Sequence, residues 1–592
     1  MILSIIYCMS VILIIGIFLI YPKSKDRENL LIWIPVSIIL YECFVCFVGG
    51  TFALAHIPAN ICSISVINII VSGLLVYNIK INRKERQKFD IEKIDIFAFG
   101  IFVIIVLLVA KYRFFPGFEL NYETSDPGTH LKYAMDCVNY NSVISPSSTM
   151  YIGQFTNALF IEVMKPVFDG VNIYKSFILK DIFNWSLSGL LFYALIKKYL
   201  KSIGLNVIGI FLTALYFCGY PLNNMLFGFV YLGITINIII FIAFVVERYN
   251  DNLYDSKIIL FMMSLGCMGC SLGYTLFAPV VFFAVCGDTT YHFFQNNIKN
   301  VKNLKEWMGE QLTIFVLPVL YTFIFIIFWD FQNAQNISGS LNAEGYIFRN
   351  LYSDFWPYIP FALAAIFLFI RKKIYNFGTF FFPLLAVYCI HFFVKMINNQ
   401  VSTYYYYKLN FAMWFVLFYL TIATISYFWS FAKEYIISLL LVITFTIMIT
   451  GVNIENKISG QNVNYHPFPN AIQINVIYEH NWIYLNRKGI SKEFIELCDK
   501  VNKCYKEEGK ITPYVGDWLQ NYWFEALTNQ RQGLHYAFLI GTEVILDEFS
   551  DGKYSDYMVV IKESDEYLKC KDKIDQMEKA YENEIGFVVK KN

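Results

Sequence analysis

Apolar runs that match the thickness of a lipid bilayer recur along most of the sequence. An α-helix needs roughly 20 apolar residues to cross about 30 Å of hydrocarbon, so each run of this length is a candidate span. Fourteen runs meet this criterion: 2–21, 30–49, 61–79, 94–112, 171–196, 204–220, 226–246, 257–273, 275–295, 311–329, 356–371, 376–393, 406–428 and 435–452. The pattern predicts an α-helical polytopic membrane protein with about 14 transmembrane helices.

The composition agrees with this class and excludes several others. Hydrophobic residues make up 57% of the chain and charged residues only 16%, whereas about a quarter of the residues of a soluble protein are charged. The 47 basic and 46 acidic residues nearly cancel, and no concentrated basic face is present to bind nucleic acid. The sequence lacks a GxxxxGK[ST] phosphate loop and an HExxH helix, so neither ATP-driven nor zinc-protease chemistry is expected.

Lysine and arginine gather in alternate loops between the spans. The loop 80–93 is rich in both, for example, whereas the loops 50–60 and 220–225 hold neither. Because cytoplasmic loops carry the excess of basic residues, the basic set is predicted to be cytoplasmic. Both termini and the long loop 113–170 then face the outside of a plasma membrane, most simply a bacterial one.

The chain divides into a membrane part and a polar tail. Residues 1–452 form the predicted transmembrane domain, with 113–170 as an external catalytic loop. The tail 453–592 holds 17 of the 47 basic and 22 of the 46 acidic residues, which predicts a soluble extracytoplasmic domain. Its expected strands and helices alternate as in a small α/β domain. They are the strands Met558–Ile561 and Ile585–Val589 and the helices Ser491–Lys506 and Tyr567–Glu584.

Ionisable residues and cysteines within the apolar runs allow two interpretations each. Five ionisable residues near the outer ends of spans either neutralise one another locally or line a polar cavity; they are Glu42, Lys175, Lys180, Asp181 and Lys395. The CxxC pairs Cys43/Cys46 and Cys267/Cys270 have no histidine partners and are expected to be buried small residues. Whether Cys498, Cys504 and Cys570 include a disulfide stays open.

The stretch that follows the fourth span carries the strongest chemical signal. It reads Phe118-Glu119-Leu120-Asn121-Tyr122-Glu123-Thr124-Ser125-Asp126-Pro127-Gly128-Thr129-His130. Pro127 favours a helix start, with Ser125 or Asp126 as the cap. Helical spacing then brings His130 within one turn of Asp126. Asp126 is either a simple helix cap or one of a pair of carboxylates, with Glu123, at the mouth of the membrane domain.

This motif and its place resemble those of the GT-C superfamily of polytopic membrane glycosyltransferases. Members carry two acidic residues, often followed by histidine, in their first external loop, and they use polyprenyl-phosphate-linked sugars. The spacing differs here, because two residues separate Glu123 from Asp126. The resemblance implies a GT-C-like fold, with Asp126 as the catalytic base and Glu123 and His130 as catalytic residues that surround it or position the acceptor.

Two further stretches are candidates for substrate binding. Ser402–Lys408 carries four consecutive tyrosines, including Tyr404 and Tyr407, before Lys408. These tyrosines form either an interfacial aromatic belt or, with Lys408 and Arg349, the phosphate side of the resembled donor site. The tail stretch Gly516–Trp523 is rich in aromatic and amide side chains, which suit sugar rings. Its first candidates are Asp517 and Trp518.

The predicted function is therefore transfer of a sugar from a polyprenyl-phosphate donor to a glycan or glycolipid acceptor of the cell envelope, on the outer face. The partners are the lipid-linked donor, the acceptor and membrane lipids. No cofactor is specified by the sequence, although a divalent metal, Mg²⁺ or Mn²⁺, is compatible with the acidic pair. The alternative is a transporter or lipid flippase with an external binding domain, which is expected to show inverted repeats and charges at the membrane midplane.

Overall fold

The structure is a computed structural model that describes most of the chain. The described residues are 1–21, 27–81, 87–122, 125–144, 152–251, 256–296, 301–328, 355, 358–401, 403–449, 454–456, 461–463, 490–530 and 537–591.

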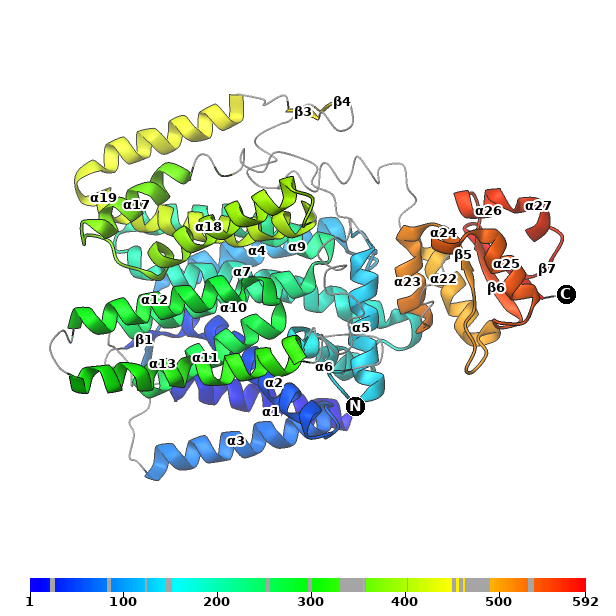
Figure 1. Ribbon diagram of the computed structural model, residues 1–592, viewed down its shortest axis with the longest axis horizontal. Coiled ribbons are helices and arrows are strands. Elements are labelled where there is room, and N and C mark those ends of the chain that lie inside the picture. The colour runs from blue at the N-terminus through cyan, green and yellow to red at the C-terminus, as the bar shows by residue number, and fades with distance from the viewer. Residues whose placement is uncertain are drawn as a thin grey trace.

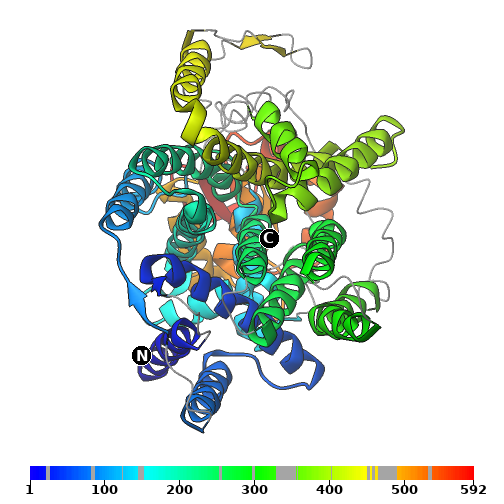
Figure 2. The ribbon, with the colours of Figure 1, turned by 90° about the vertical axis from the view of Figure 1, so that its left-hand side faces the viewer.

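Long apolar helices dominate the described residues and run roughly side by side (Figures 1 and 2). Ten segments are long and apolar enough to cross a membrane, which confirms a multi-pass membrane protein; the count of fourteen stays a prediction. The bundle helices are α1 (Ile2–Ile20), α2 (Leu30–Leu54), α3 (Ile61–Ile81), α4 (Lys93–Arg113), α7 (Tyr174–Ile196), α8 (Ile203–Cys218), α9 (Tyr220–Phe227), α10 (Val230–Asn250), α11 (Ser256–Gly273), α12 (Ala278–Asn296), α13 (Val301–Thr322), α17 (Ile359–Ile370), α18 (Phe377–Ile397) and α19 (Thr403–Ile449).

Two breaks between consecutive helices fall at glycine or proline. The tight turn expected at Gly273–Tyr274 separates α11 from α12, and Gly219 and Pro221 separate α8 from α9. The predicted spans 406–428 and 435–452 are instead parts of one helix, α19. No glycine or proline lies between them to interrupt its backbone hydrogen bonds. The helix changes direction sharply along its length (Figure 1).

The short helices of the loop 113–170 and the C-terminal domain lie at one end of the bundle, which we call the domain end (Figure 1). The N-terminus and the C-terminal domain both lie there, as expected if both termini face the same side. The loop 113–170 contributes α5 (Asp126–Tyr140) and α6 (Phe155–Met164). It also contributes the short helices η1 (Ile152–Gln154) and η2 (Gly170–Ile173).

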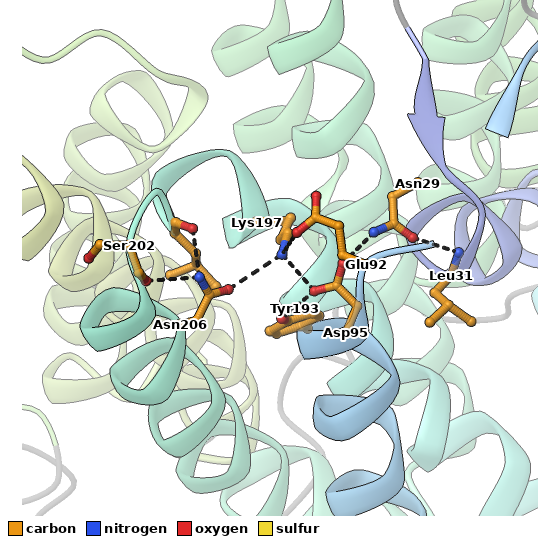
Figure 3. Close-up of polar contacts among 9 residues, drawn as sticks. Asn29, Leu31, Glu92, Asp95, Tyr193, Lys197, Ser202 and Asn206 are labelled. Carbon is orange, nitrogen blue, oxygen red and sulfur yellow. Dashed lines mark hydrogen bonds and ion pairs between the residues drawn. The ribbon is translucent and has the colours of Figure 1, made fainter. Parts of the chain in front are cut away.

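A buried ion network joins helices α4 and α7 to Asn29 at the opposite end of the bundle (Figure 3). The carboxylate of Asp95, on α4, is fully buried and accepts hydrogen bonds from Lys197 Nζ (2.6 Å), Tyr193 Oη (2.7 Å) and Asn29 Nδ2. Lys197 also donates to Glu92 (2.9 Å). Asn29 belongs to β1 (Glu28–Asn29), which pairs in parallel with β2 (Phe89–Asp90). Because each buried charge has partners, the network stabilises the bundle and is not free to bind a ligand.

The C-terminal domain contains a four-stranded sheet with the order β5-β6-β8-β7. The pair β5–β6 is parallel, and β6–β8 and β8–β7 are antiparallel. The strands are β5 (Tyr514–Val515), β6 (Tyr557–Ile561), β7 (Glu578–Glu582) and β8 (Gly586–Lys590). The helices are α22 (Lys492–Lys500), which continues as a π-helix over Val501–Tyr505, α23 (Trp518–Thr528), α24 (Ala537–Ile540), α25 (Thr542–Ser550), α26 (Asp565–Lys569) and α27 (Lys571–Ile574). A separate hairpin joins β3 (Ile454–Asn456) and β4 (Gln461–Val463).

This arrangement confirms the α/β class and corrects one element of it. The strands predicted near residues 558–561 and 585–589 and the helix predicted from Ser491 are present. The helix predicted over Tyr567–Glu584 is wrong, because its second half forms β7. Residues such as Glu578 and Lys579 favour helices locally, but pairing with β8 prevails. β7 is an edge strand, where charged side chains are common.

Candidate active site

Asp126 begins α5, with Ser125 as the cap residue and Pro127 in the first turn. The helix therefore starts one residue earlier than the proline alone suggested. Two close backbone approaches fix its position. A Cβ atom at Gly228, whose φ is +73°, would lie 2.2 Å from Pro127 Cγ, and one at Gly128 would lie 2.8 Å from the backbone of Trp523. The start of α5 is thus held between the α9–α10 turn and helix α23 of the C-terminal domain.

Lys408 lies in the first turns of α19, with only 3% of its surface exposed. Its ammonium donates a hydrogen bond to the hydroxyl of Tyr231. Four aromatic rings surround the charge. Its Nζ is 5.2 Å from the ring centre of Phe229, 4.8 Å from Tyr231, 5.2 Å from Tyr274 and 5.7 Å from Tyr405. Because the faces of such rings are negative, the cage compensates part of the lost hydration of the cation.

The charges of Asp126 and Lys408 interact, although 282 positions separate the residues in sequence. Burial raises the pKa of Asp126 to about 6, and the attraction of Lys408 limits this rise. A carboxylate with a pKa near 6 is a stronger base than an ordinary aspartate and is still ionised at neutral pH. The residue as a whole is only partly buried.

His130 lies one turn further along α5, where it is buried. Its Nδ1 is 2.9 Å from Gln154 Nε2, so the amide donates and Nδ1 accepts when the ring is neutral. The imidazole ring lies 5.1 Å from the ring of Tyr231, the residue that accepts the Lys408 hydrogen bond. Burial, and then the positive charge of Lys408, lower the pKa of His130 to about 3. The histidine is therefore neutral and acts as a hydrogen-bonding group, not as a cation.

Helix α23 brings two aromatic residues of the C-terminal domain to the same place. Burial and then the charge of Asp126 raise the pKa of Tyr522, which shows that the phenol and the carboxylate are neighbours. The ring of Trp523 lies 5.8 Å from that of Tyr122, whose hydroxyl donates to Asp181 (2.8 Å). The site is thus formed jointly by the bundle, the loop and the C-terminal domain.

The structure brings three of the predicted site residues together and separates others. Asp126, His130 and Lys408 converge as described above. Tyr407 is buried and packs against Phe411, with ring centres 5.3 Å apart, so it is not part of a belt facing lipid. Asp517 is partly buried at the start of α23, where it makes no capping hydrogen bond with its side chain.

Four predicted site residues cannot be placed. Glu123 and Arg349 lie outside the described residues. Tyr404 and Trp518 lie in α19 and α23, but their side chains are outside the described part of the structure.

Several residues of the site were missed by the sequence analysis. Phe229, Tyr231 and Tyr274 lie at the turns α9–α10 and α11–α12, and Gln154 ends η1. The available signal was their place near the predicted external ends of spans, where ring systems can approach an incoming ligand. Single aromatic residues in such positions are frequent, however, so the sequence did not distinguish these from lipid-facing ones.

Of the five ionisable residues within spans, Glu42 and Lys180 neutralise each other. Lys180 pairs with Glu42 (2.8 Å) and donates to Asn184 (2.8 Å). Asp181 accepts from Tyr122, and Lys395 donates to Gln400 (2.7 Å). The Glu42–Lys180 pair fits the neutralisation interpretation, whereas Asp181 and Lys395 contact neutral side chains.

Metal ligands and disulfides were also left open by the sequence. Among the described residues, no group of three or more His, Cys, Asp or Glu side chains is arranged to hold a metal ion. The cysteines are free thiols throughout the described ranges, including the buried Cys498 and Cys570 and the exposed Cys504. The role of Mg²⁺ or Mn²⁺ stays a prediction, because Glu123 is not described.

The fold is similar to two solved structures. ArnT from Cupriavidus metallidurans in the apo state shares 11% identity, with a TM-score of 0.45, over 83% of this chain and 98% of that one. The archaeal oligosaccharyltransferase AglB from Archaeoglobus fulgidus, in complex with an inhibitory peptide and a dolichol-phosphate, shares 12% identity, with a TM-score of 0.43, over 78% of this chain and 69% of that one. Similarities at this level concern the fold, and no activity follows from them.

Neither a protein-family model nor the sequence of a curated protein matches the chain.

Proposed function

We propose that this protein is a GT-C-type glycosyltransferase that moves a sugar from a polyprenyl-phosphate donor to a glycan or glycolipid acceptor of the cell envelope. The observation that carries the proposal is the convergence of Asp126, His130 and Lys408 at the domain end of the bundle. A carboxylate with a raised pKa and a buried cation are the two groups that such a transfer requires.

The acceptor hydroxyl must lose its proton as it attacks the sugar. Asp126 is the base, because its pKa of about 6 combines ionisation at neutral pH with useful proton affinity. His130, held by Gln154 and neutral, orients the acceptor or the carboxylate. The Asp126 carboxylate takes the proton, and the sugar carbon exchanges its bond to the phosphate oxygen for a bond to the acceptor oxygen.

The departing phosphate needs positive charge more than it needs a proton, because it is already a weak base. Lys408 supplies this charge from a site with little water, where electrostatic stabilisation is strong. In the structure the ammonium is held by Tyr231 and the surrounding rings. A donor phosphate that reaches the cage gains a charge-assisted contact with Lys408, and the Tyr231 hydroxyl is placed to donate to the same phosphate.

A test of this function uses the full-length protein in liposomes, labelled polyprenyl-phosphate sugars and an envelope extract as acceptor. Asp126→Asn preserves the shape of the side chain and removes its basicity. Transfer is expected to fall by about 10²–10⁴-fold, the usual worth of general-base catalysis, with normal expression and melting temperature. Retention of most of the activity would remove Asp126 as the base and overturn the proposal.

The proposal places the site on the outer face of the membrane, which the alternation of basic loops supports. A cysteine placed at Glu508, an exposed residue of the C-terminal domain, is expected to react with an impermeant maleimide added outside intact cells, and one placed at Lys84 is expected not to react. A variant whose native exposed cysteines are replaced provides the background. The reverse labelling pattern would assign the site to the cytoplasmic face.

A further inference from the structure

A groove separate from the Lys408 cage lies between the external loop and the C-terminal domain. One wall consists of the segment Gly117–Asn121 with Tyr174, and the other of residues 490–493 and 495 with Glu584 and Ile585. Its volume is about 440 Å³, within the range of about 300–1,000 Å³ that is usual for binding sites of small ligands.

The walls of the groove are fixed by backbone and side-chain hydrogen bonds. Leu120 and Ile490 form an antiparallel bridge between the two walls. Asn121 Nδ2 donates to the carbonyl of Arg113 at the end of α4 (2.9 Å). Asn583 Nδ2 donates to the carbonyl of Glu493 (2.8 Å). The groove therefore exists before any ligand binds, which lowers the entropic cost of binding.

The lining combines carboxylates, an amide and aromatic rings. Three carboxylates, those of Glu119, Glu493 and Glu584, outnumber the lysine of the lining, Lys492. Lys175 lies beside the groove, with Nζ 5.9 Å from the ring centres of both Phe118 and Tyr174. Even with this second lysine, the groove carries an excess of negative charge, which disfavours an anionic ligand.

We propose that the groove binds an uncharged stretch of the acceptor glycan; this inference rests on the proposed transferase function. Carboxylates accept hydrogen bonds from sugar hydroxyls, amides both accept and donate them, and aromatic faces pack against the apolar faces of sugar rings. The donor phosphate is excluded from the groove by its charge and is attracted to Lys408. The two substrates are thus separated by the charge of their sites.

The distance between the groove and Asp126 limits how long a ligand must be to reach both. Six residues of chain lead from Leu120, in the groove wall, to Asp126, so the two are at most about 20 Å apart. An oligosaccharide that spans up to about 20 Å can therefore fill the groove and present a hydroxyl to Asp126. The groove binds sugar units that precede the one that is glycosylated.

The test measures binding of tetrasaccharides to the full-length protein in detergent by saturation-transfer NMR at low salt. The probes are uncharged tetramers of glucose, galactose and N-acetylglucosamine, and tetragalacturonate as the anionic probe. At least one uncharged probe is expected to bind at least tenfold more tightly than tetragalacturonate. Equal or tighter binding of tetragalacturonate, or binding of no uncharged probe, would overturn the proposal.

Charge reversal in the groove locates the binding. The double variant Glu119→Lys/Glu493→Lys is expected to lose about tenfold in affinity for the uncharged probe, because accepting groups are lost, and to gain affinity for tetragalacturonate. Glu496→Lys/Glu508→Lys is the matched control, since both residues are exposed, lie in the same domain outside the groove and make the same change of net charge. If both double variants behave alike, the groove is not the binding site.

Failure of this inference is distinguishable from failure of the proposed function. Asp126→Asn is expected to bind the uncharged probe as the wild type does, since Asp126 does not line the groove. Binding that depends on Glu119 and Glu493, without transfer from any polyprenyl-phosphate donor, would keep the glycan site and remove the transferase. Transfer that depends on Asp126, with binding unaffected by the groove variant, would keep the transferase and remove the glycan site.

Discussion

Replacing Lys408 by methionine is the substitution that best separates a donor site from a structural lysine. Lys408 donates a hydrogen bond to Tyr231 and is surrounded by four aromatic rings, one of them that of Tyr231. Only 3% of its surface reaches solvent. If it stabilises the donor phosphate, Lys408→Met loses a charge-assisted contact worth about 1.5–3 kcal/mol. At about 1.4 kcal/mol for each factor of ten, transfer is expected to fall by roughly 10- to 150-fold.

The same substitution is expected to leave the fold intact. The cation–π contacts that are lost contribute about 2 kcal/mol when desolvated, but the cost of burying an ammonium disappears with them. Methionine fills the cage and makes favourable sulfur–aromatic contacts. We therefore expect the free energy of unfolding to change by no more than about 1 kcal/mol, measured by thermal unfolding in detergent.

The pH dependence of transfer provides an independent readout of Lys408. A base works only when deprotonated, so wild-type transfer is expected to fall as the pH drops through about 6, the pKa of Asp126. His130 does not contribute to this limb, because its pKa of about 3 keeps it neutral. Lys408 lowers the pKa of Asp126, so without it the pKa rises, and transfer by Lys408→Met falls at a higher pH than wild-type transfer.

Two companion variants complete the experiment. Lys408→Arg retains the charge, so its acidic limb is expected to stay close to that of the wild type, with transfer only partly reduced because the planar guanidinium has a different shape. Lys395→Met removes a lysine near the domain end of α18 that donates to Gln400, and no effect on transfer is expected. Full transfer by Lys408→Met with an unchanged acidic limb would refute the assignment of Lys408 to the site.

Two further predictions concern the parts that hold the site in place. Asp95→Asn removes the buried charge that pairs with Lys197. We expect the free energy of unfolding to fall by about 3 kcal/mol, the low end for a broken buried pair, because Lys197 keeps its contact with Glu92. An unchanged melting temperature would contradict this. Gly228→Ala places a Cβ against Pro127 at a φ of +73°. It is expected to lower transfer by displacing Asp126 and to lower the free energy of unfolding by about 1–2 kcal/mol. A wild-type kcat in this variant would show that the close approach does not position the base.

The sequence predicted the membrane class, because a bilayer imposes one length and one polarity on every crossing helix. The prediction failed at the boundary between the spans 406–428 and 435–452, which the structure joins into one helix. Nothing in 429–434 breaks a helix, so α19 continues where a loop was expected. It failed again at β7, where a charged edge strand has the local composition of a helix and only its pairing with β8 determines the outcome.

The candidate site could be predicted in part for a similar reason. Asp126 and His130 are close in sequence and share a helix, so their proximity follows from helical spacing. Lys408 stood out as the cation that directly follows four consecutive tyrosines at the external end of a predicted span. Its proximity to Asp126 depends on how α19 packs against the α9–α10 turn. The hydrophobic periodicity of the sequence does not predict this packing. Tyr231 was missed because its importance comes only from its contacts with Lys408 and His130.

The position of the base on the loop, and not within the bundle, has a mechanical consequence. The segment from Gly117 to Asp126 contributes one wall of the groove and ends in the proposed base. The C-terminal domain holds both ends of this segment, through the Leu120–Ile490 bridge and through helix α23 against Gly128. A glycan bound in the groove contacts both walls and so opposes their separation. If the groove binds the acceptor as proposed, acceptor binding also stabilises the position of Asp126 relative to Lys408.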